Sequence, residues 1–154
     1  MIGKRGDNLH LIIDGFDCDA DQIADSSKVL EFLDSYPDAI GMTKIIAPSV
    51  KIYKGIKPED WGVSGFVIIA ESHISVHTFP ERNYINIDVF SCKDFDSDLA
   101  LKQIPSIFSI GKMKHWLLDR GIDHIDPLTA EDIIGIERNE ITETISLSDF
   151  KKPV

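Results

Sequence analysis

The chain has 154 residues, 43% of them hydrophobic, which fits one soluble domain with a core of its own. Its formal net charge of −10 argues against binding to nucleic acid or to anionic membranes, since both need a basic surface. No apolar run approaches the roughly 20 residues that span a bilayer. The N-terminal MIGKRGDN lacks the apolar segment of a secretory signal, so the sequence predicts a cytoplasmic protein with Cys18 and Cys92 as free thiols.

The first part of the chain predicts strands around one helix. Residues 8–16 are apolar and predict a strand. Residues 20–36 have apolar side chains at roughly helical spacing, and Pro37 is expected to end this helix. Residues 42–47 and 50–54 predict two further strands, and the polar, turn-rich residues 55–62 predict a loop. Trp61 in that loop is expected either to plug the core, which is favoured, or to form part of a pocket lip.

The second part predicts a long hairpin followed by a helix and a last strand. Strands are predicted at 65–70, 73–79 and 84–91, with a turn at 80–83. A helix is predicted at 98–108, with Pro105 in its interior and Gly111 as its stop, and a strand at 112–120. Residues 123–154 are acidic and predict a helix with a tail.

This order of elements predicts an α+β fold, a two-layer α/β sandwich with a mainly antiparallel sheet and helices on one face. We expect one domain over residues 1–122 and a C-terminal extension over 123–154.

Residues 64–92 concentrate the groups that carry chemistry. His73 and His77 are four apart, with His10, Glu71 and Cys92 as further candidate metal ligands. In a strand, residues four apart lie about 13 Å from each other, too far to share one ion. We therefore predict no metal site.

Nucleophilic catalysis is the second possibility for this stretch. Ser72 or Cys92 supplies a nucleophile, His73 or His77 a base, and Asp88 a carboxylate that orients a histidine. The chain has no Gly-x-Ser-x-Gly elbow, no phosphate-binding loop and no GxGxxG, which disfavours hydrolases and nucleotide-binding enzymes of those types. A serine between glutamate and histidine, directly after an apolar run, still stands out.

The sequence ESHISVHTFPE at residues 71–81, followed by DVFSC at 88–92, resembles the signature of the small prokaryotic S-adenosylmethionine decarboxylases. WGVSG at residues 61–65 and HLIID at 10–14 also resemble that family, and the likeness covers about residues 8–120. Members are pyruvoyl-dependent enzymes of polyamine synthesis that cut their own chain. The resemblance implies the same activity here, with no metal and no PLP.

The resemblance also implies a role for each residue of the motif. Cleavage is expected between Glu71 and Ser72, and Ser72 becomes the pyruvoyl group that forms a Schiff base with the substrate. His77 is the expected base of processing, and Ser64 assists it. Cys92 is the expected proton donor in decarboxylation.

Glu81 matches a carboxylate that accepts hydrogen bonds from the substrate ribose. Lys93, where members often have glycine, and Phe79, where many have another aromatic residue, depart from the family pattern. These departures leave two alternatives: an arginine or ornithine decarboxylase on the same scaffold, or a binding or regulatory homologue that never cleaves.

Strand geometry adds one expectation about assembly. Ser72 and His77 are five residues apart, so in a regular strand their side chains point to opposite faces. Members of the family are dimers with sites at the interface, which implies a homodimer of cleaved protomers. Ser72 and Cys92 then come from one protomer, and Ser64, His77 and Glu81 come from the other.

Overall fold

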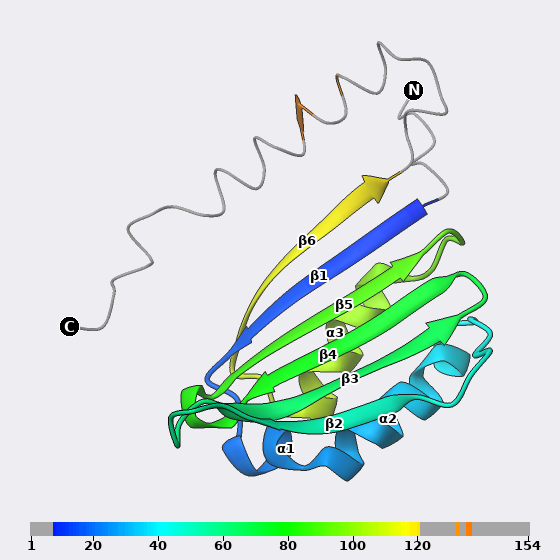
Figure 1. The fold of residues 1–154 in the computed structure, drawn as a ribbon. Helices are drawn as coiled ribbons and strands as arrows, with labels where there is room; N and C mark the ends of the chain where they lie inside the picture. The colour runs from blue at the N-terminus through cyan, green and yellow to red at the C-terminus, as the bar shows by residue number, and fades with distance from the viewer. Residues whose placement is uncertain (1–7, 121–131, 133–134, 137–154) are drawn as a thin grey trace.

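The structure, a computed structural model, describes residues 8–120, 132 and 135–136. Residues 8–120 form one six-stranded antiparallel sheet with strand order β2-β3-β4-β5-β1-β6, shown in Figure 1. The elements in chain order are β1 (Asn8–Phe16), α1 (Ala20–Ala24), α2 (Ser26–Ala39), β2 (Ser49–Lys54), β3 (Trp61–Ile69), β4 (Ser72–Phe79), the 3₁₀ turn η1 (Pro80–Arg82), β5 (Tyr84–Ser91), α3 (Ser97–Phe108) and β6 (Lys112–Arg120).

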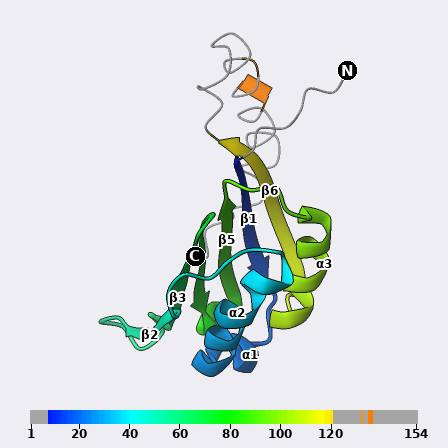
Figure 2. The ribbon, with the colours of Figure 1, turned by 90° about the vertical axis from the view of Figure 1, so that its right-hand side faces the viewer.

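Within residues 8–120 the helices all lie on one side of the sheet, as Figure 2 shows. Burial alternates strictly along β1 and β5, because every second side chain points toward the helices. The core between the two layers is built from these inward strand positions and from one stripe of α2 and α3, which includes Leu11, Ile87, Val29, Leu33, Ile104 and Phe108. The predicted α+β sandwich is therefore confirmed.

The predicted single helix at 20–36 is wrong in two respects. It is divided into α1 and α2 at Asp25, whose extended backbone and side chain cap the amides of Ser27 and Lys28. Pro37 does not end α2, which continues to Ala39. The proline sits in the last turn, where its ring is buried against the core.

The predicted strand at 42–47 is also wrong. This segment makes one isolated bridge, from Lys44 to Ile69, beside the end of β3. Its backbone bonds are few: Ala70 donates to the carbonyl of Thr43 at 2.8 Å, and Ile45 donates to that of Ile68 at 3.2 Å. Pro48 has no N–H to continue the pairing.

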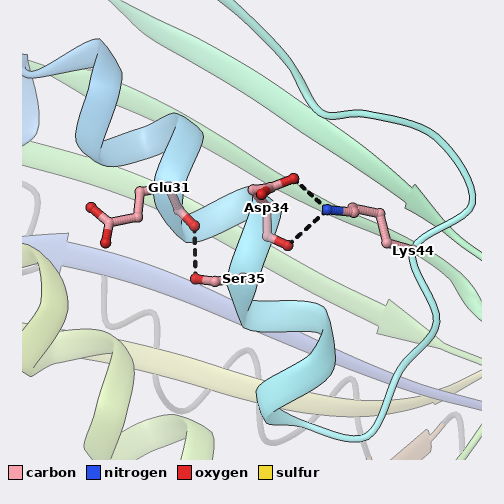
Figure 3. A network of polar contacts seen from close by, with 4 residues as sticks. All are labelled: Glu31, Asp34, Ser35 and Lys44. Atoms are coloured by element: carbon pink, nitrogen blue, oxygen red, sulfur yellow. Dashed lines mark hydrogen bonds and ion pairs between the residues drawn. The ribbon is translucent and has the colours of Figure 1, made fainter.

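The side chain of Lys44 holds this segment to α2. Its ammonium group donates to the backbone carbonyl of Asp34 at 3.2 Å and forms an ion pair with the Asp34 carboxylate (Figure 3). Figure 3 also shows the hydroxyl of Ser35 donating to the carbonyl of Glu31 one turn earlier, at 2.8 Å. Lys44 thus holds the loop to α2 on one side, and its bridge to Ile69 holds the loop to β3 on the other.

The remaining boundaries differ by a few residues. β3 begins at Trp61 rather than at 65, so Trp61 and Gly62 belong to the sheet and not to the loop. α3 begins at Ser97 and ends before Ser109, whose left-handed backbone stops the helix ahead of Gly111. The predicted strands at 8–16, 84–91 and 112–120 are confirmed. The predictions for 123–154 fall outside the described residues, apart from 132 and 135–136.

Candidate active site

A two-residue turn of unusual geometry joins β3 to β4. Ile69 pairs with Ser72, so only Ala70 and Glu71 form the loop. Turns of this length favour positive φ at their central residues and glycine to supply it. Here neither loop residue has positive φ, and Ser72 instead has a φ of 151°. A residue with a side chain rarely adopts this conformation, so backbone strain lies directly after the peptide bond that is expected to break.

The carbonyl group of that peptide bond is held from the neighbouring strand. The backbone N–H of Cys92 donates to the carbonyl oxygen of Glu71 at 2.8 Å, where β5 ends beside the start of β4. When a nucleophile attacks a carbonyl carbon, negative charge develops on the oxygen, and an aligned N–H stabilises it. The Cys92 N–H is therefore placed to stabilise an oxyanion at the Glu71 carbonyl.

The side chain of Glu71 is also fixed. Its Oε2 accepts a hydrogen bond of 3.0 Å from the backbone N–H of Thr43, and the N–H of Ala70 donates to the carbonyl of Thr43 at 2.8 Å. This role of Thr43 could not be predicted from the sequence, because it uses only the backbone N–H of Thr43 and joins residues 28 apart in the chain.

The two cysteines lie in contrasting environments. Cys92 is exposed and adjoins the turn, and Cys18 is 3% exposed within the core. Burial, with a smaller contribution from Asp17, raises the pKa of the Cys18 thiol to about 11. Both are free thiols, as predicted, and only Cys92 is placed where it can meet a ligand.

Ser64 and His77 form a second group of candidate residues. They are direct partners in the β3–β4 ladder, and Nδ1 of His77 lies 3.0 Å from Oγ of Ser64. Their side chains leave the sheet on the face opposite the core, since Val63, Val76 and Thr78 are the buried neighbours. The predicted partnership of Ser64 with His77 therefore has the required geometry.

Glu81 lies in the turn η1 after β4, four residues after His77. Its carboxylate accepts a 3.0 Å hydrogen bond from Nε1 of Trp61, so the indole is not the core plug that the sequence predicted. The approach of the two segments depends on Gly62, because a Cβ there would lie 1.8 Å from the carbonyl oxygen of Thr78. A cavity of about 170 Å³ opens here, lined by Tyr53, Asp60, Trp61, Gly62, Ser64, Thr78, Phe79 and Arg82.

The two groups stand at opposite ends of β4. Ser72 is the first residue of the strand and His77 is the sixth, so they are about 16 Å apart at ~3.3 Å per residue. Ser72 shares the alternation of the buried Ile74 and Val76, whereas His77 is exposed on the other face. Within one chain the structure does not bring Ser72 and His77 together.

A third polar group lies on the face of the sheet away from the helices. Nε2 of His10 is 2.8 Å from Oδ1 of Asp88, and Phe90 contacts both His10 and His73 edge-on or tilted. Asp88 therefore partners His10, and not the catalytic histidine that the sequence suggested. Among the described residues, no group of three or more His, Cys, Asp or Glu side chains is arranged to hold a metal ion.

Similarity to known proteins covers nearly the same residues as the described fold. A family model described as S-adenosylmethionine decarboxylase matches residues 9–121. The chain is 34% identical over 113 residues to the S-adenosylmethionine decarboxylase proenzyme of Archaeoglobus fulgidus, covering 73% of this chain and 96% of that protein. It is 35% identical over 130 residues to the proenzyme of the same name from Pyrococcus furiosus, covering 83% and 88%.

Two further comparisons extend the likeness to bacteria. The S-adenosylmethionine decarboxylase proenzyme of Clostridium botulinum strain Langeland is 45% identical over 89 residues, which are 57% of this chain and 72% of that protein. The crystal structure of the adenosylmethionine decarboxylase from Aquifex aeolicus superposes with a TM-score of 0.61 at 31% identity, covering 75% of this chain and 91% of that one. No helix in the described part of our chain is long and apolar enough to cross a bilayer.

Proposed function

Because the chain belongs to the S-adenosylmethionine decarboxylase family, we propose that it is a proenzyme that cuts itself between Glu71 and Ser72 and then decarboxylates S-adenosylmethionine. One observation carries the proposal: the Glu71 carbonyl accepts a hydrogen bond from the Cys92 N–H, and the next residue in the chain, Ser72, has a strained backbone. These residues supply a nucleophile in the Ser72 hydroxyl, an electrophile in the Glu71 carbonyl, and an N–H of Cys92 that can stabilise the oxyanion.

Cleavage uses groups of this chain. The Ser72 hydroxyl attacks the Glu71 carbonyl carbon, the Cys92 N–H stabilises the oxyanion, and the C–N bond breaks to leave an ester and a free amine. A base then removes the Ser72 α-proton, the Cβ–O bond breaks, and Glu71 departs as a carboxylate. Addition of water and loss of ammonia convert the remaining dehydroalanine to a pyruvoyl group.

The residues present fit such a group at position 72. A pyruvoyl ketone there supplies the carbonyl that binds the substrate amine covalently and accepts the electrons released with carbon dioxide. The exposed Cys92 thiol, on the strand end beside residue 72, holds the proton for the substrate carbon. Glu81 has a free carboxylate oxygen beside its contact with Trp61, which suits it to accept ribose hydroxyls.

A second copy of the chain supplies what one copy cannot. His77 is the proposed base, but it lies far from Ser72 in its own strand. The sheet face that carries Ser64 and His77 also exposes Phe66 (45%) and Ile68 (39%), and no helix of residues 8–120 covers it. We propose a two-fold homodimer in which this face and the adjoining β3–β4 turn meet their equivalents, so that the main chain at Ser72, with Cys92 beside it, opposes Ser64, His77 and Glu81 of the other protomer.

Denaturing mass spectrometry of the purified chain tests the cleavage. We expect two fragments that separate before residue 72, in place of the intact 17.2 kDa species. Substrate identity is tested on the same sample with carboxyl-labelled S-adenosylmethionine, arginine and ornithine, each with borohydride to trap the covalent adduct on residue 72. Release of label from S-adenosylmethionine alone is the expected result. Persistence of the intact chain after long incubation would contradict the proposal, and preference for arginine or ornithine would reassign the substrate.

A further inference from the structure

A closed ring of contacts surrounds the peptide bond between Glu71 and Ser72. The ring runs from the Cys92 N–H to the Glu71 carbonyl, and from the Glu71 carboxylate to the Thr43 N–H. From Thr43 the backbone leads back to Gly41, whose carbonyl accepts a 2.9 Å hydrogen bond from the ammonium group of Lys93. Lys93 follows Cys92 in the chain and completes the ring.

The Lys93 side chain is the link that joins the two halves of this ring. Its own backbone is fixed by the buried hydroxyl of Ser91, which accepts the Lys93 N–H at 2.9 Å and donates to the Lys93 carbonyl at 2.6 Å. The same hydroxyl oxygen is 3.5 Å from the sulfur of Met42, in the middle of the segment 41–43. The turn that presents the Cys92 N–H is therefore tied to the segment that holds Glu71.

The opposite side of the ring is anchored to the helical layer. Lys44, next to Thr43, binds the carboxylate and the carbonyl of Asp34 in α2 (Figure 3). Segment 41–45 is thus fastened to a rigid helix at one point, to the end of β3 at a second, and to Lys93 at a third. Such over-determination is what holds a strained residue such as Ser72 in place.

We propose that Lys93 is a positioning residue for self-cleavage: by binding the Gly41 carbonyl, it keeps the Cys92 N–H aligned on the Glu71 carbonyl oxygen. The inference rests on the proposed self-cleavage and adds a residue that acts through the backbone of its neighbour. Lys93 is exposed and its side chain makes a single hydrogen bond, so that side chain contributes little to overall stability. Its effect falls on the rate of the first step, which is sensitive to small displacements of the reacting atoms.

The test compares Lys93→Met, Lys93→Arg and a matched control, Lys112→Met. Lys112 is also exposed and makes one ion pair of 3.1 Å with Asp17, at the other end of the sheet. Full-length chains are made by pulsed cell-free translation, and the half-time of fragment appearance is followed by denaturing electrophoresis. We expect cleavage about tenfold slower in Lys93→Met, close to wild type in Lys93→Arg, and unchanged in Lys112→Met.

Two further measurements separate positioning from other roles. Hydroxylamine cuts an ester, so it reveals chains that completed the acyl shift but not the elimination. A slow first step leaves no such ester in Lys93→Met, and accumulation of ester would overturn the proposal. The melting temperature, measured in a Ser72→Ala background, should fall by about 2 °C or less. A larger fall or failure to fold would overturn it too, since Lys93 would then support the fold.

The outcomes also distinguish this inference from the proposed function. If the wild-type chain does not cleave, self-processing itself is wrong. If wild type cleaves and Lys93→Met cleaves at the same rate, only the role of Lys93 is wrong.

Discussion

Cys92 donates its backbone N–H to the carbonyl oxygen of Glu71 at 2.8 Å, and its thiol remains exposed. The residue thus offers two independent groups to two successive reactions. In the proposed mechanism the amide stabilises the oxyanion of cleavage, and the thiol supplies a proton in decarboxylation. The two roles can be separated by mutation because one belongs to the backbone and the other to the side chain.

Cys92→Ala should therefore cleave at nearly the wild-type rate, since alanine retains the N–H. Its decarboxylation rate should fall by about 10²- to 10⁴-fold, the usual contribution of a positioned acid. Release of labelled carbon dioxide measures the second effect, and mass spectrometry of the fragment beginning at residue 72 measures the first. As protonation on the wrong carbon inactivates the enzyme, we also expect the N-terminal pyruvoyl group of that fragment to be converted to alanine, which mass spectrometry detects. Undiminished turnover would exclude the thiol as the donor.

Ser72→Ala and Ser72→Gly should both remain uncleaved, because neither has a hydroxyl group to attack Glu71. Their stabilities should nevertheless differ. Alanine keeps the strain of a φ of 151°, which glycine adopts freely, so Ser72→Gly should be more stable to urea by about 1–3 kcal/mol. Equal unfolding free energies would show that the turn relaxes, and that strain does not assist cleavage.

Mixed dimers test whether Ser72 and His77 meet across an interface. Ser72→Ala and His77→Ala chains should each remain intact alone. When the two are co-expressed with different tags, the His77→Ala chain should be cut, because its serine meets the intact histidine of the Ser72→Ala chain. Sedimentation should show dimers in all samples. Cleavage of neither chain in the mixture would contradict an active site shared between protomers.

The stability of the fold should decrease in mild acid because of His73. Burial lowers the pKa of His73, and the neighbouring His10 and Arg120 lower it further against the opposing effect of Asp88. The unfolded chain then takes up a proton first, near pH ~6.5, so unfolding free energy falls as pH drops from there through the folded pKa. Urea titrations at pH 8 and 5.5 in the Ser72→Ala background should show a smaller acid loss for His73→Gln.

The matched control for His73 is His115→Gln, which removes an exposed imidazole on β6. If the unfolding free energy of His73→Gln falls between pH 8 and pH 5.5 as much as that of the parent, the pH dependence comes from other groups.

Thiol reagents should distinguish the two cysteines. At pH 8 the native protein should react quickly at Cys92, whereas Cys18 is buried and its raised pKa of about 11 keeps it protonated. A chromogenic disulfide should therefore titrate one thiol in the native state and two in urea. Decarboxylation activity should be lost at the same rate as the fast-reacting thiol, Cys92, is labelled. Fast reaction of Cys92→Ala would show that Cys18 is accessible.

The sequence predicted best where a local pattern decides the structure. The bounds predicted for β1, β5 and β6 match the structure to the residue, and five residues of separation were enough to place Ser72 and His77 on different faces. These inferences need only the geometry of one strand.

Prediction was poorer where partners distant in the chain decide. Residues 42–47 have the composition of a strand, but the contacts of Thr43 and Lys44 with Glu71 and Asp34 determine their path. The sequence marked Lys93 only as a departure from the family pattern, because its contact with Gly41 spans 52 residues. No periodic pattern reports a pairing of that range.

The strand order also determines what becomes of the two pieces once the chain is cut. The piece before Ser72 carries β1, β2 and β3, and the piece after it carries β4, β5 and β6. In the sheet β1 lies between β5 and β6, and β3 lies against β4, so three of the five strand-to-strand junctions within residues 8–120 join one piece to the other. Strands of the two pieces are therefore interleaved within one sheet. A mature protomer is therefore expected to behave as one particle until denatured, and to reassemble afterwards only by an encounter of two molecules whose rate depends on concentration.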